Sequence, residues 1–353
     1  MNVALLYMDA LHDGGYPRDI RWLAGALARQ GLSVSLVANP GTHEDGLDSV
    51  TLADPEDFAS LARGADVVHI WMLFVPGQFS VWRTIGSNVP LVVSPAAQLL
   101  PAHLKKRWWK KIPYLLGMQP TLLRLRPVAH LFSEAERPAA SRWLHTSRYF
   151  EASLGVFPAS VESVPVIDSH DYLLFFGRND VYQKGIDILL RAYADASRAG
   201  LDIPLIIAGR PHGDSASVLQ ALIADLGIDR RVQVLGEVPE ESKNQLIQRA
   251  RCLAFLSRWD GPPRPIRDAI ALGTPVIVSR ETTLGGLVDT AGAGRQVNLD
   301  VHNVAAALLE AQDDETIMLW SNGVHALLGD LTWDRVAERY VSGYRLAAGP
   351  RSP

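Results

Sequence analysis

The chain has 353 residues, of which 48% are hydrophobic and 20% charged, a composition typical of soluble globular proteins and a length comfortable for two domains. Its formal net charge of −4 gives no reason to expect bulk nucleic-acid binding, and the single cysteine, Cys252, excludes an intrachain disulfide. The sequence contains no run of about eighteen apolar residues of the kind that spans a membrane. Its opening apolar stretch is too short for a signal peptide. We therefore expect a cytoplasmic protein.

The first half alternates continuous apolar runs, typical of strands buried on both faces, with amphipathic segments typical of helices. Gly14 and Gly15 lie in the loop after the first run, before a helix expected over about 17–30. No Gly-x-Gly-x-x-Gly follows that run, so the loop is not a dinucleotide fingerprint, and taken alone it is a flexible turn. Ser133 and Glu136 have the spacing of a helix capping box. Strands are expected at 3–8, 32–37, 66–71, 91–95 and 128–132.

Residues 104–116 form the most basic segment, with basic side chains before and after Trp108 and Trp109 and an apolar patch beyond them. Segments of this composition can lie on an anionic membrane surface. They can also form a solvated amphipathic helix that covers a binding cleft, and this is the interpretation that we favour from the sequence.

Periodicity is lost from Gly155 to about residue 170, where two prolines occur, and this stretch indicates an interdomain linker. We therefore divide the chain into a domain over 1–160, a second domain over 161–335 and a final helical segment over 336–353. Both domains are expected to be α/β, with doubly wound parallel sheets. In the second, strands are expected at 172–176, 205–209, 232–236, 252–256 and 276–279, and helices at 186–193, 216–226, 301–311 and 332–344.

The stretch 257–279 reads as a strand end, a loop, a short helix and the next strand, and it carries two carboxylates eight positions apart, Asp260 and Asp268. Pro265 suits the first helical position, which would place Asp268 in the first helical turn, where a carboxylate is favoured. Both acids would then lie at the carboxyl edge of a parallel sheet, where open α/β sheets bind phosphorylated ligands. The alternative is an ordinary strand–helix–strand crossover with surface aspartates.

This stretch resembles the donor-site signature of retaining glycosyltransferases of the GT-B fold, in the large family four group. In that signature two glutamates, with seven residues between them as here, precede Ala, an apolar and a small residue, Gly and Thr-Pro-Val. Asp260 and Asp268 occupy the glutamate positions, each one methylene shorter, and Ala269, Gly273 and 274–276 match. The resemblance implies two facing Rossmann-like domains with a cleft between them. The first would lie on the acceptor side, the second would bind the nucleotide-sugar donor, and the last helix would pack back on the first.

A Gly-Arg pair after the strand at 172–176 and a Lys-Gly pair six residues later match further motifs of the family. The resemblance implies that Arg178 and Lys184 stabilise the nucleotide diphosphate leaving group, whose negative charge grows as the glycosidic bond breaks. It also implies that Asp268 holds the ribose hydroxyls and that Asp260 holds a sugar hydroxyl near the anomeric centre. The other donor-binding positions that it implies are Gly15, Gly177, Gly209, Val238, Leu284, Gly285 and Gly286.

We therefore expect a retaining, hexosyltransferase-like glycosyltransferase that moves a sugar from a nucleotide diphosphate sugar to an acceptor hydroxyl, without a metal or another cofactor. The acceptor would be a glycan, a lipid-linked molecule or a small molecule, and residues 104–116 would supply any peripheral contact with the inner membrane face. The alternative is a GT-B-fold binding or partner subunit that has lost transfer. Its motivation is that both glutamates are shortened and that Ala96 replaces a histidine common in relatives. A Rossmann-type oxidoreductase would lack its glycine fingerprint.

Overall fold

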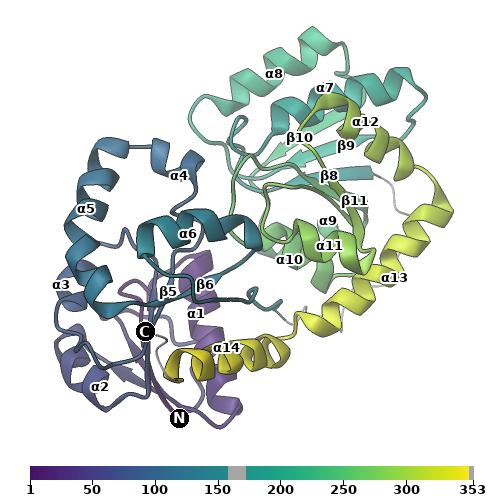
Figure 1. The fold of residues 1–353 in the computed structure, drawn as a ribbon. Helices are drawn as coiled ribbons and strands as arrows, with labels where there is room; N and C mark the ends of the chain where they lie inside the picture. The colour runs from purple at the N-terminus through teal and green to yellow at the C-terminus, as the bar shows by residue number, and fades with distance from the viewer. Residues whose placement is uncertain (158–171, 350–353) are drawn as a thin grey trace. The chain divides into compact units, whose positions relative to one another are not determined.

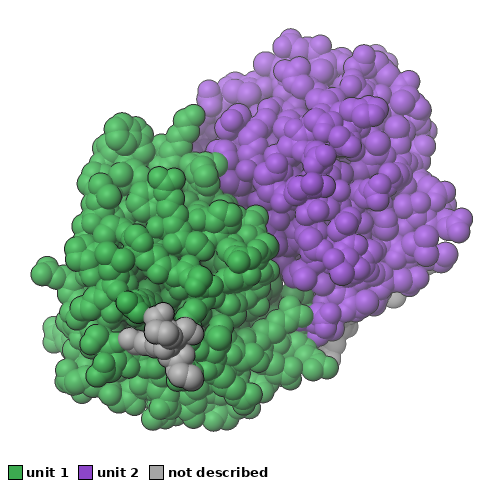
Figure 2. Space-filling view, in the orientation of Figure 1, with its two compact units in different colours: residues 1–155, 331–353 green, residues 156–330 purple. Residues whose placement is uncertain are grey.

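The chain folds into two compact units. The computed structural model describes residues 1–157 and 172–349. Unit 1 comprises Met1–Gly155 and Leu331–Pro353, and unit 2 comprises Val156–Asp330 (Figures 1 and 2). Most of the predicted linker, with both of its prolines, lies outside the described residues.

Unit 1 is built around a seven-stranded parallel sheet. The first strand lies between the second and the fourth and pairs in parallel with both. The strand order therefore reverses between the first strand and the fourth. The strands in spatial order are β3 (Val50–Ala53), β2 (Ser33–Val37), β1 (Asn2–Leu6), β4 (Val67–Trp71), β5 (Leu91–Ser94), β6 (Val128–Leu131) and β7 (Tyr149–Glu151). The helices are α1 (Gly15–Arg29), α2 (Phe58–Gly64), α3 (Gln78–Trp82), α4 (Pro101–Lys105), α5 (Trp108–Leu125), α6 (Arg137–Leu144) and α14 (Trp333–Ala348), with 3₁₀ turns η1 (Pro55–Asp57) and η2 (Glu134–Glu136).

Unit 2 repeats this architecture with a six-stranded parallel sheet, whose order reverses between β8 and β11. The strands in spatial order are β10 (Val232–Gly236), β9 (Leu205–Ala208), β8 (Tyr172–Phe176), β11 (Ala250–Phe255), β12 (Val276–Ser279) and β13 (Gly294–Val297). The helices are α7 (Ile186–Arg198), α8 (Ser215–Leu226), α9 (Glu240–Gln248), α10 (Arg264–Ala271), α11 (Gly285–Ala291), α12 (Val301–Glu310) and α13 (Asp314–Asp330). The two sheets confirm the predicted pair of doubly wound α/β units.

The strands that the sequence did not predict lie at the sheet edges. β3 and β7 contain no fully buried residue, so neither produces the continuous apolar run of a covered strand. β13 is likewise a short edge strand. The long helix α13 also went unpredicted, because Gly323 interrupts its pattern; a Cβ atom there would lie 2.2 Å from the carbonyl oxygen of Gly292, so the helix needs that glycine.

A chain of hydrogen bonds in the core of unit 1 joins α14 to the sheet. His69 lies 2.8 Å from the Tyr344 hydroxyl through Nδ1 and 2.6 Å from Ser94 Oγ through Nε2. Ser94 Oγ is 2.6 Å from Nδ1 of His130, whose Nε2 is 2.9 Å from the carbonyl oxygen of Ala152. Since that carbonyl only accepts, His130 donates to it, and because burial favours the neutral imidazole, its other nitrogen accepts from Ser94. Ser94 then accepts from His69, which accepts from Tyr344, so both imidazoles are neutral.

Acidification is expected to destabilise unit 1 through these two histidines. Burial lowers the pKa of His130 to about 3, and burial together with the charge of His130 lowers the pKa of His69 well below its usual value. The two histidines take up protons below about pH 6.5 in the unfolded chain. As the pH falls below that value, the free energy of unfolding therefore decreases by up to about 2.7 kcal/mol per pH unit for the two histidines together. Urea unfolding between about pH 7 and 5 measures this slope. His130→Gln should reduce it by about half, whereas the exposed His12→Gln should leave it unchanged; equal slopes in both variants would contradict this assignment.

Candidate active site

Polar side chains and glycines gather where the strands of unit 2 end. Because the strands are parallel, the loops after β8, β9, β11 and β12 all leave the same edge of the sheet. Isolated parallel bridges tie these loops together, Asn179 to Pro211 and Asp260 to Thr282. Doubly wound sheets bind ligands outside the carboxyl ends of the strands where the order reverses, which here is between β8 and β11.

Lys184 and Asp260 form a partly buried ion pair at this reversal point. The Lys184 ammonium contacts Oδ2 of Asp260, and the two side chains keep 11% and 21% of their exposure. The ammonium also lies 5.0 Å from the centroid of the Phe255 ring, and Ser257 Oγ is 3.3 Å from the same carboxylate oxygen. One positive and one negative group are thus held side by side where solvent access is low.

The backbone of Gly185 brings Lys184 to the end of β11. Gly185 has a φ of 65°, in the left-handed region that favours glycine. A Cβ atom at this position would lie 2.0 Å from the carbonyl oxygen of Leu256, so the turn packs directly against the backbone after β11. A larger residue would move Lys184 away from Asp260. The Lys-Gly pair seen in the sequence therefore has a geometric reason.

Arg178 is exposed and joins the same group through Gln183. Nη2 of Arg178 donates to Oε1 of Gln183 at 2.8 Å, and it lies 3.6 Å from Oδ2 of Asp180. The side-chain nitrogen Nε2 of Gln183 in turn donates to the carbonyl oxygen of Trp259 at 3.3 Å. Trp259 is the residue before Asp260 in the chain. The two predicted cations therefore flank one glutamine, which the sequence analysis did not single out.

Asp268 lies on the same side of the sheet but in a different environment from the one predicted. The prediction that it occupies the first helical turn is wrong, because α10 begins at Arg264 with Pro263 as its N-cap and without an acidic residue in the first turn. A proline is tolerated at the second helical position too, since its amide would be unpaired there. Asp268 is instead bound by cations, with Lys243 Nζ at 3.1 Å and Arg264 Nε at 3.6 Å.

Two of the predicted glycines touch each other. Gly177 and Gly209 follow neighbouring strands and have φ angles of 151° and 136°. A Cβ atom on Gly209 would lie 1.8 Å from the carbonyl oxygen of Gly177, and the Gly209 amide donates to the carbonyl oxygen of Gly236 at 2.6 Å. Close packing of the loops thus requires glycine at position 209 even without a ligand. Val238 is half-buried in the loop before α9.

The predicted phosphate loop lies at the start of the short helix α11. Leu284 is buried, and the Gly285 amide donates to the carbonyl oxygen of Thr282 at 3.1 Å, so that amide is already used within the turn. Gly286 is exposed, and a Cβ atom there would meet nothing within 4 Å. Of these predicted positions, Gly286 thus offers the open backbone.

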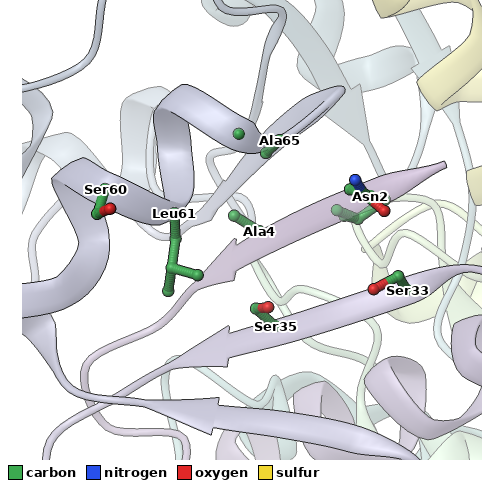
Figure 3. A pocket seen from close by; sticks show the side chains of 9 residues that line it. Asn2, Ala4, Ser33, Ser35, Ser60, Leu61 and Ala65 are labelled. Carbon is green, nitrogen blue, oxygen red and sulfur yellow. The ribbon is translucent and has the colours of Figure 1, made fainter.

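Gly15 belongs to the other unit, where it begins α1 after Gly14, whose φ is 145°. It is exposed at the carboxyl end of β1, the position in unit 1 that corresponds to the Gly177 loop in unit 2. A hollow of about 280 Å³ in unit 1 lies at the opposite, amino end of β1 and β2 (Figure 3), away from the edge where such sheets bind ligands. Its lining residues are Asn2, Val3, Ala4, Ser33, Ser35, Ser60, Leu61, Gly64 and Ala65.

Comparison with known proteins identifies the family of the unit that contains this sheet edge. The family model for glycosyl transferases group 1 matches residues 161–316, nearly the whole of unit 2. The second unit is a group 1 glycosyltransferase domain. This confirms the group 1 glycosyltransferase membership that the Asp260–Asp268 stretch predicted for this unit.

Curated relatives of the chain include two bacterial mannosyltransferases. The GDP-mannose:cellobiosyl-diphosphopolyprenol alpha-mannosyltransferase of Xanthomonas oryzae pv. oryzae is 29% identical over 81% of this chain and 76% of its own length. The O-antigen chain mannosyltransferase B of Escherichia coli is 28% identical over 52% of this chain and 50% of its own length. The chain therefore spans about half the length of that second relative.

Solved structures show that the chain has the GT-B fold. HepE from Anabaena, in complex with UDP, superimposes with a TM-score of 0.68 at 17% identity, covering 97% of this chain and 99% of HepE. Sucrose-phosphate synthase from Thermosynechococcus elongatus superimposes with a TM-score of 0.66 at 18% identity, covering 98% of each chain. The predicted fold class is thereby confirmed.

Two residues of the chain have environments that the sequence did not predict. Lys243 on α9 keeps 6% of its side-chain exposure beside Asp268. Glu136 is buried in unit 1, where its carboxylate accepts from the amides of Ala97 at 2.8 Å and Phe132 at 2.9 Å, and burial raises its pKa to about 7. The predicted capping box is half right, because the Ser133 side chain makes no capping hydrogen bond although the Glu136 carboxylate bonds the Ser133 backbone. Glu136 stabilises the left-handed backbone at Ala97, whose φ is 62°.

Proposed function

We propose that the chain transfers a sugar from a nucleotide diphosphate sugar to an acceptor hydroxyl, with retention of the anomeric configuration and without a metal ion. Lys184 and Arg178 stabilise the departing diphosphate. Asp260 faces the sugar and Asp268 binds the ribose hydroxyls. The exposed backbone of Gly286 and the backbone near Gly177, Gly209 and Val238 complete the donor site in unit 2.

The observation that carries this proposal is the ion pair between Lys184 and Asp260. Glycosyl transfer separates charge, because the leaving oxygen becomes negative while the anomeric carbon becomes positive. A fixed ammonium next to a fixed carboxylate has the polarity that stabilises this separation, and its effect is larger where water is mostly excluded. Arg178, which is hydrogen-bonded to the Gln183 side chain next to Lys184 in the chain, adds a planar donor suited to phosphate oxygens.

The names of the similar proteins narrow the class of nucleotide sugar that we propose as the donor. The Xanthomonas relative is named for GDP-mannose, and HepE was solved with UDP, so guanosine and uridine diphosphate sugars are the first donors to compare. We place the reaction in the cytoplasm, where such donors would meet a glycan, a lipid-linked molecule or a small-molecule acceptor.

Hydrolysis of a panel of nucleotide sugars tests the proposal. The purified full chain is incubated with GDP-mannose, UDP-glucose and related donors, and released nucleoside diphosphate is measured with and without a chelator. We expect turnover of one donor class, equal rates in both arms, and a freshly released sugar whose NMR spectrum shows the anomeric configuration of the donor. Inversion, or loss of turnover with the chelator, would overturn the corresponding part of the proposal.

Calorimetric titration separates the enzyme from a partner subunit that has lost transfer. An enzyme binds at least one nucleoside diphosphate and turns over its sugar. A protein that binds GDP or UDP but shows no release of product from any donor would favour the second candidate, whose motivation is the shortened carboxylates at Asp260 and Asp268. Absence of nucleotide binding altogether would contradict the donor site itself.

Lys243 is expected to position Asp268 for the donor. Lys243→Met removes the nearer of the two cations that lie beside the Asp268 carboxylate in the described part of the chain, so ribose binding weakens and the donor KM should rise about tenfold. Because the ribose does not react, kcat should stay within about twofold. Initial rates over a range of donor concentrations measure both constants, and Lys243→Arg, which keeps the charge, should recover most of the lost KM. A fall in kcat at unchanged KM would contradict this role.

A further inference from the structure

The carboxylate of Asp180 lies between two basic side chains at the carboxyl edge of the sheet of unit 2. Its Oδ2 is 3.6 Å from Nη2 of Arg178 and 3.7 Å from Nε2 of His212. Asp180 keeps 18% of its side-chain exposure, whereas Arg178 and His212 keep 44% and 47%. The loops after β8 and β9 thus share one carboxylate, next to the bridge that ties them together, and His212 is a neighbour of the candidate site that the sequence analysis did not single out.

Asp180 also organises the loop that carries the two predicted cations. Its Oδ1 accepts from the backbone amide of Gln183 at 3.0 Å, and its carbonyl oxygen accepts from the amide of Lys184 at 2.9 Å. Its own amide donates to the carbonyl oxygen of Arg178 at 2.8 Å. An aspartate that hydrogen-bonds to nearby backbone groups holds a turn in one conformation. Asp180 therefore sets the places from which Arg178 and Lys184 leave the backbone.

His212 is fixed at the start of α8. Its backbone amide donates to Oγ of Ser215 at 2.9 Å, and its carbonyl oxygen accepts from the Ser215 amide at 3.2 Å. The other charged side chains of its own loop and of the loop after β10 are Arg210, Asp214 and Glu237, and all three are exposed. In the described part of the chain, neither of those acids forms an ion pair with the ring. The carboxylate described above is thus the acid that faces His212.

The cations expected to hold the diphosphate are balanced by acids of the protein. Lys184 contacts Asp260. Arg178 lies within ion-pair distance of Asp180, so these two pairs together carry no net charge. A neutral His212 leaves this balance unchanged, whereas an imidazolium adds one positive charge. Because the added charge lies beside the carboxylate that competes with a diphosphate for Arg178, it favours binding of an anion twice over.

We propose that Asp180 and His212 position Arg178 for the diphosphate of the donor. Protonated His212 pairs with Oδ2 of Asp180, which leaves the guanidinium of Arg178 to the phosphate oxygens. That guanidinium is equipped for this role, because among the described residues it donates one hydrogen bond, to Gln183, and its other N–H groups are open. This inference rests on the proposed function, and it adds regulation by pH to the same site.

The direction of the pH dependence follows from the charge of histidine. Histidine changes its charge between about pH 5 and 8, and its charged form is the one present at lower pH. Donor affinity should therefore be higher at low pH and should fall as His212 loses its proton. Since a ligand that favours the protonated form also favours uptake of the proton, the bound donor should move this titration to higher pH.

Calorimetric titration across this pH range tests the proposal. The full chain, in whose described part no helix is long and apolar enough to cross a membrane, is titrated with UDP-glucose and with GDP-mannose. Nucleotide sugars are used because they lack the terminal phosphate, whose second proton titrates at about pH 6. We expect the parent to bind its donor about fivefold or more tightly at about pH 6 than at about pH 8.5, with a smaller ratio at high salt.

Three substitutions assign the effect. His212→Gln should bind at every pH with the weak affinity that the parent has at about pH 8.5. His212→Lys, which keeps a positive charge throughout, should bind tightly at every pH. Asp180→Asn keeps an acceptor for the Gln183 amide but removes the charge, so the midpoint of the pH dependence should move to lower pH. The matched control, His325→Gln, removes an exposed histidine from α13 and should reproduce the profile of the parent.

The variants also exclude another titrating group. Glu136 in unit 1, whose pKa burial raises to about 7, is present in all of them, so a pH dependence that persists in His212→Gln would overturn the proposal. A flat profile in a parent that binds a nucleotide sugar, or an unchanged midpoint in Asp180→Asn, would overturn it while leaving the proposed function intact. Failure of the parent to bind either nucleotide sugar at any pH would overturn both. Urea unfolding of each variant verifies that it is folded.

Discussion

Lys184→Met is expected to lower kcat/KM for donor turnover by about 100- to 1,000-fold. Methionine keeps the unbranched apolar stem but removes the ammonium that stabilises the leaving diphosphate. Loss of one preorganised charge partner in a site of low solvent access costs about 3–4 kcal/mol in the transition state, and Lys184 is only 11% exposed. Release of nucleoside diphosphate from the best donor measures the effect. Arg191→Met, which removes an exposed cation from α7, is the matched control and should keep the parent rate.

The substitution also leaves Asp260 without its cation, so lost stability must be separated from lost chemistry. The double variant Lys184→Met with Asp260→Asn removes both charges. Its free energy of unfolding should recover most of the roughly 1–3 kcal/mol that the single variant loses, while its turnover stays low. Near-normal turnover by the single variant, or turnover that returns together with stability in the double variant, would contradict the role of Lys184.

Gly209→Ala is expected to destabilise unit 2 by about 3 kcal/mol or more. The new methyl group would lie 1.8 Å from the carbonyl oxygen of Gly177, a backbone atom that moves only if the end of β8 moves. Arg178 follows directly, so donor affinity should fall as well. Urea unfolding measures the stability, and nucleotide titration measures the affinity.

Gly227→Ala separates the clash from backbone strain. Gly227 ends α8 with a φ of 67°, and a Cβ atom there would meet nothing within 4 Å. Its replacement should therefore cost only the roughly 1–2 kcal/mol of a left-handed alanine. Equal losses of stability in Gly209→Ala and Gly227→Ala would contradict the close contact between the two loops after β8 and β9.

The fold could be predicted from the sequence wherever strands are covered on both faces. β4 and β5 are buried along their whole length. β10 is an exception, because the sequence predicted its bounds although it is an edge strand without a fully buried residue. The edge strands β3, β7 and β13 escaped prediction, because a partly exposed strand of three or four residues has neither a continuous apolar run nor a clear alternation.

The candidate site was predictable where a motif fixes the local backbone. Lys184 and Asp260 are 76 residues apart, yet each was identified from a short pattern, and they lie in contact. Asp268 was identified too, but its environment was not, since a stretch with prolines at 262, 263 and 265 allows more than one helix start. Lys243 could not be identified at all, because nothing within α9 distinguishes a lysine that pairs with a buried carboxylate from one that faces water.

By itself, the sequence determined the parallel α/β architecture, the family and the residues that gather at the carboxyl edge of the second sheet. These follow from local causes, namely apolar runs, glycines that permit close approach, and spacings fixed by turns and helices. Only the tertiary structure decided which cations balance Asp268 and which groups His69 and His130 hydrogen-bond with. Each of these depends on what a distant segment places against the residue, and a one-dimensional pattern does not carry that information.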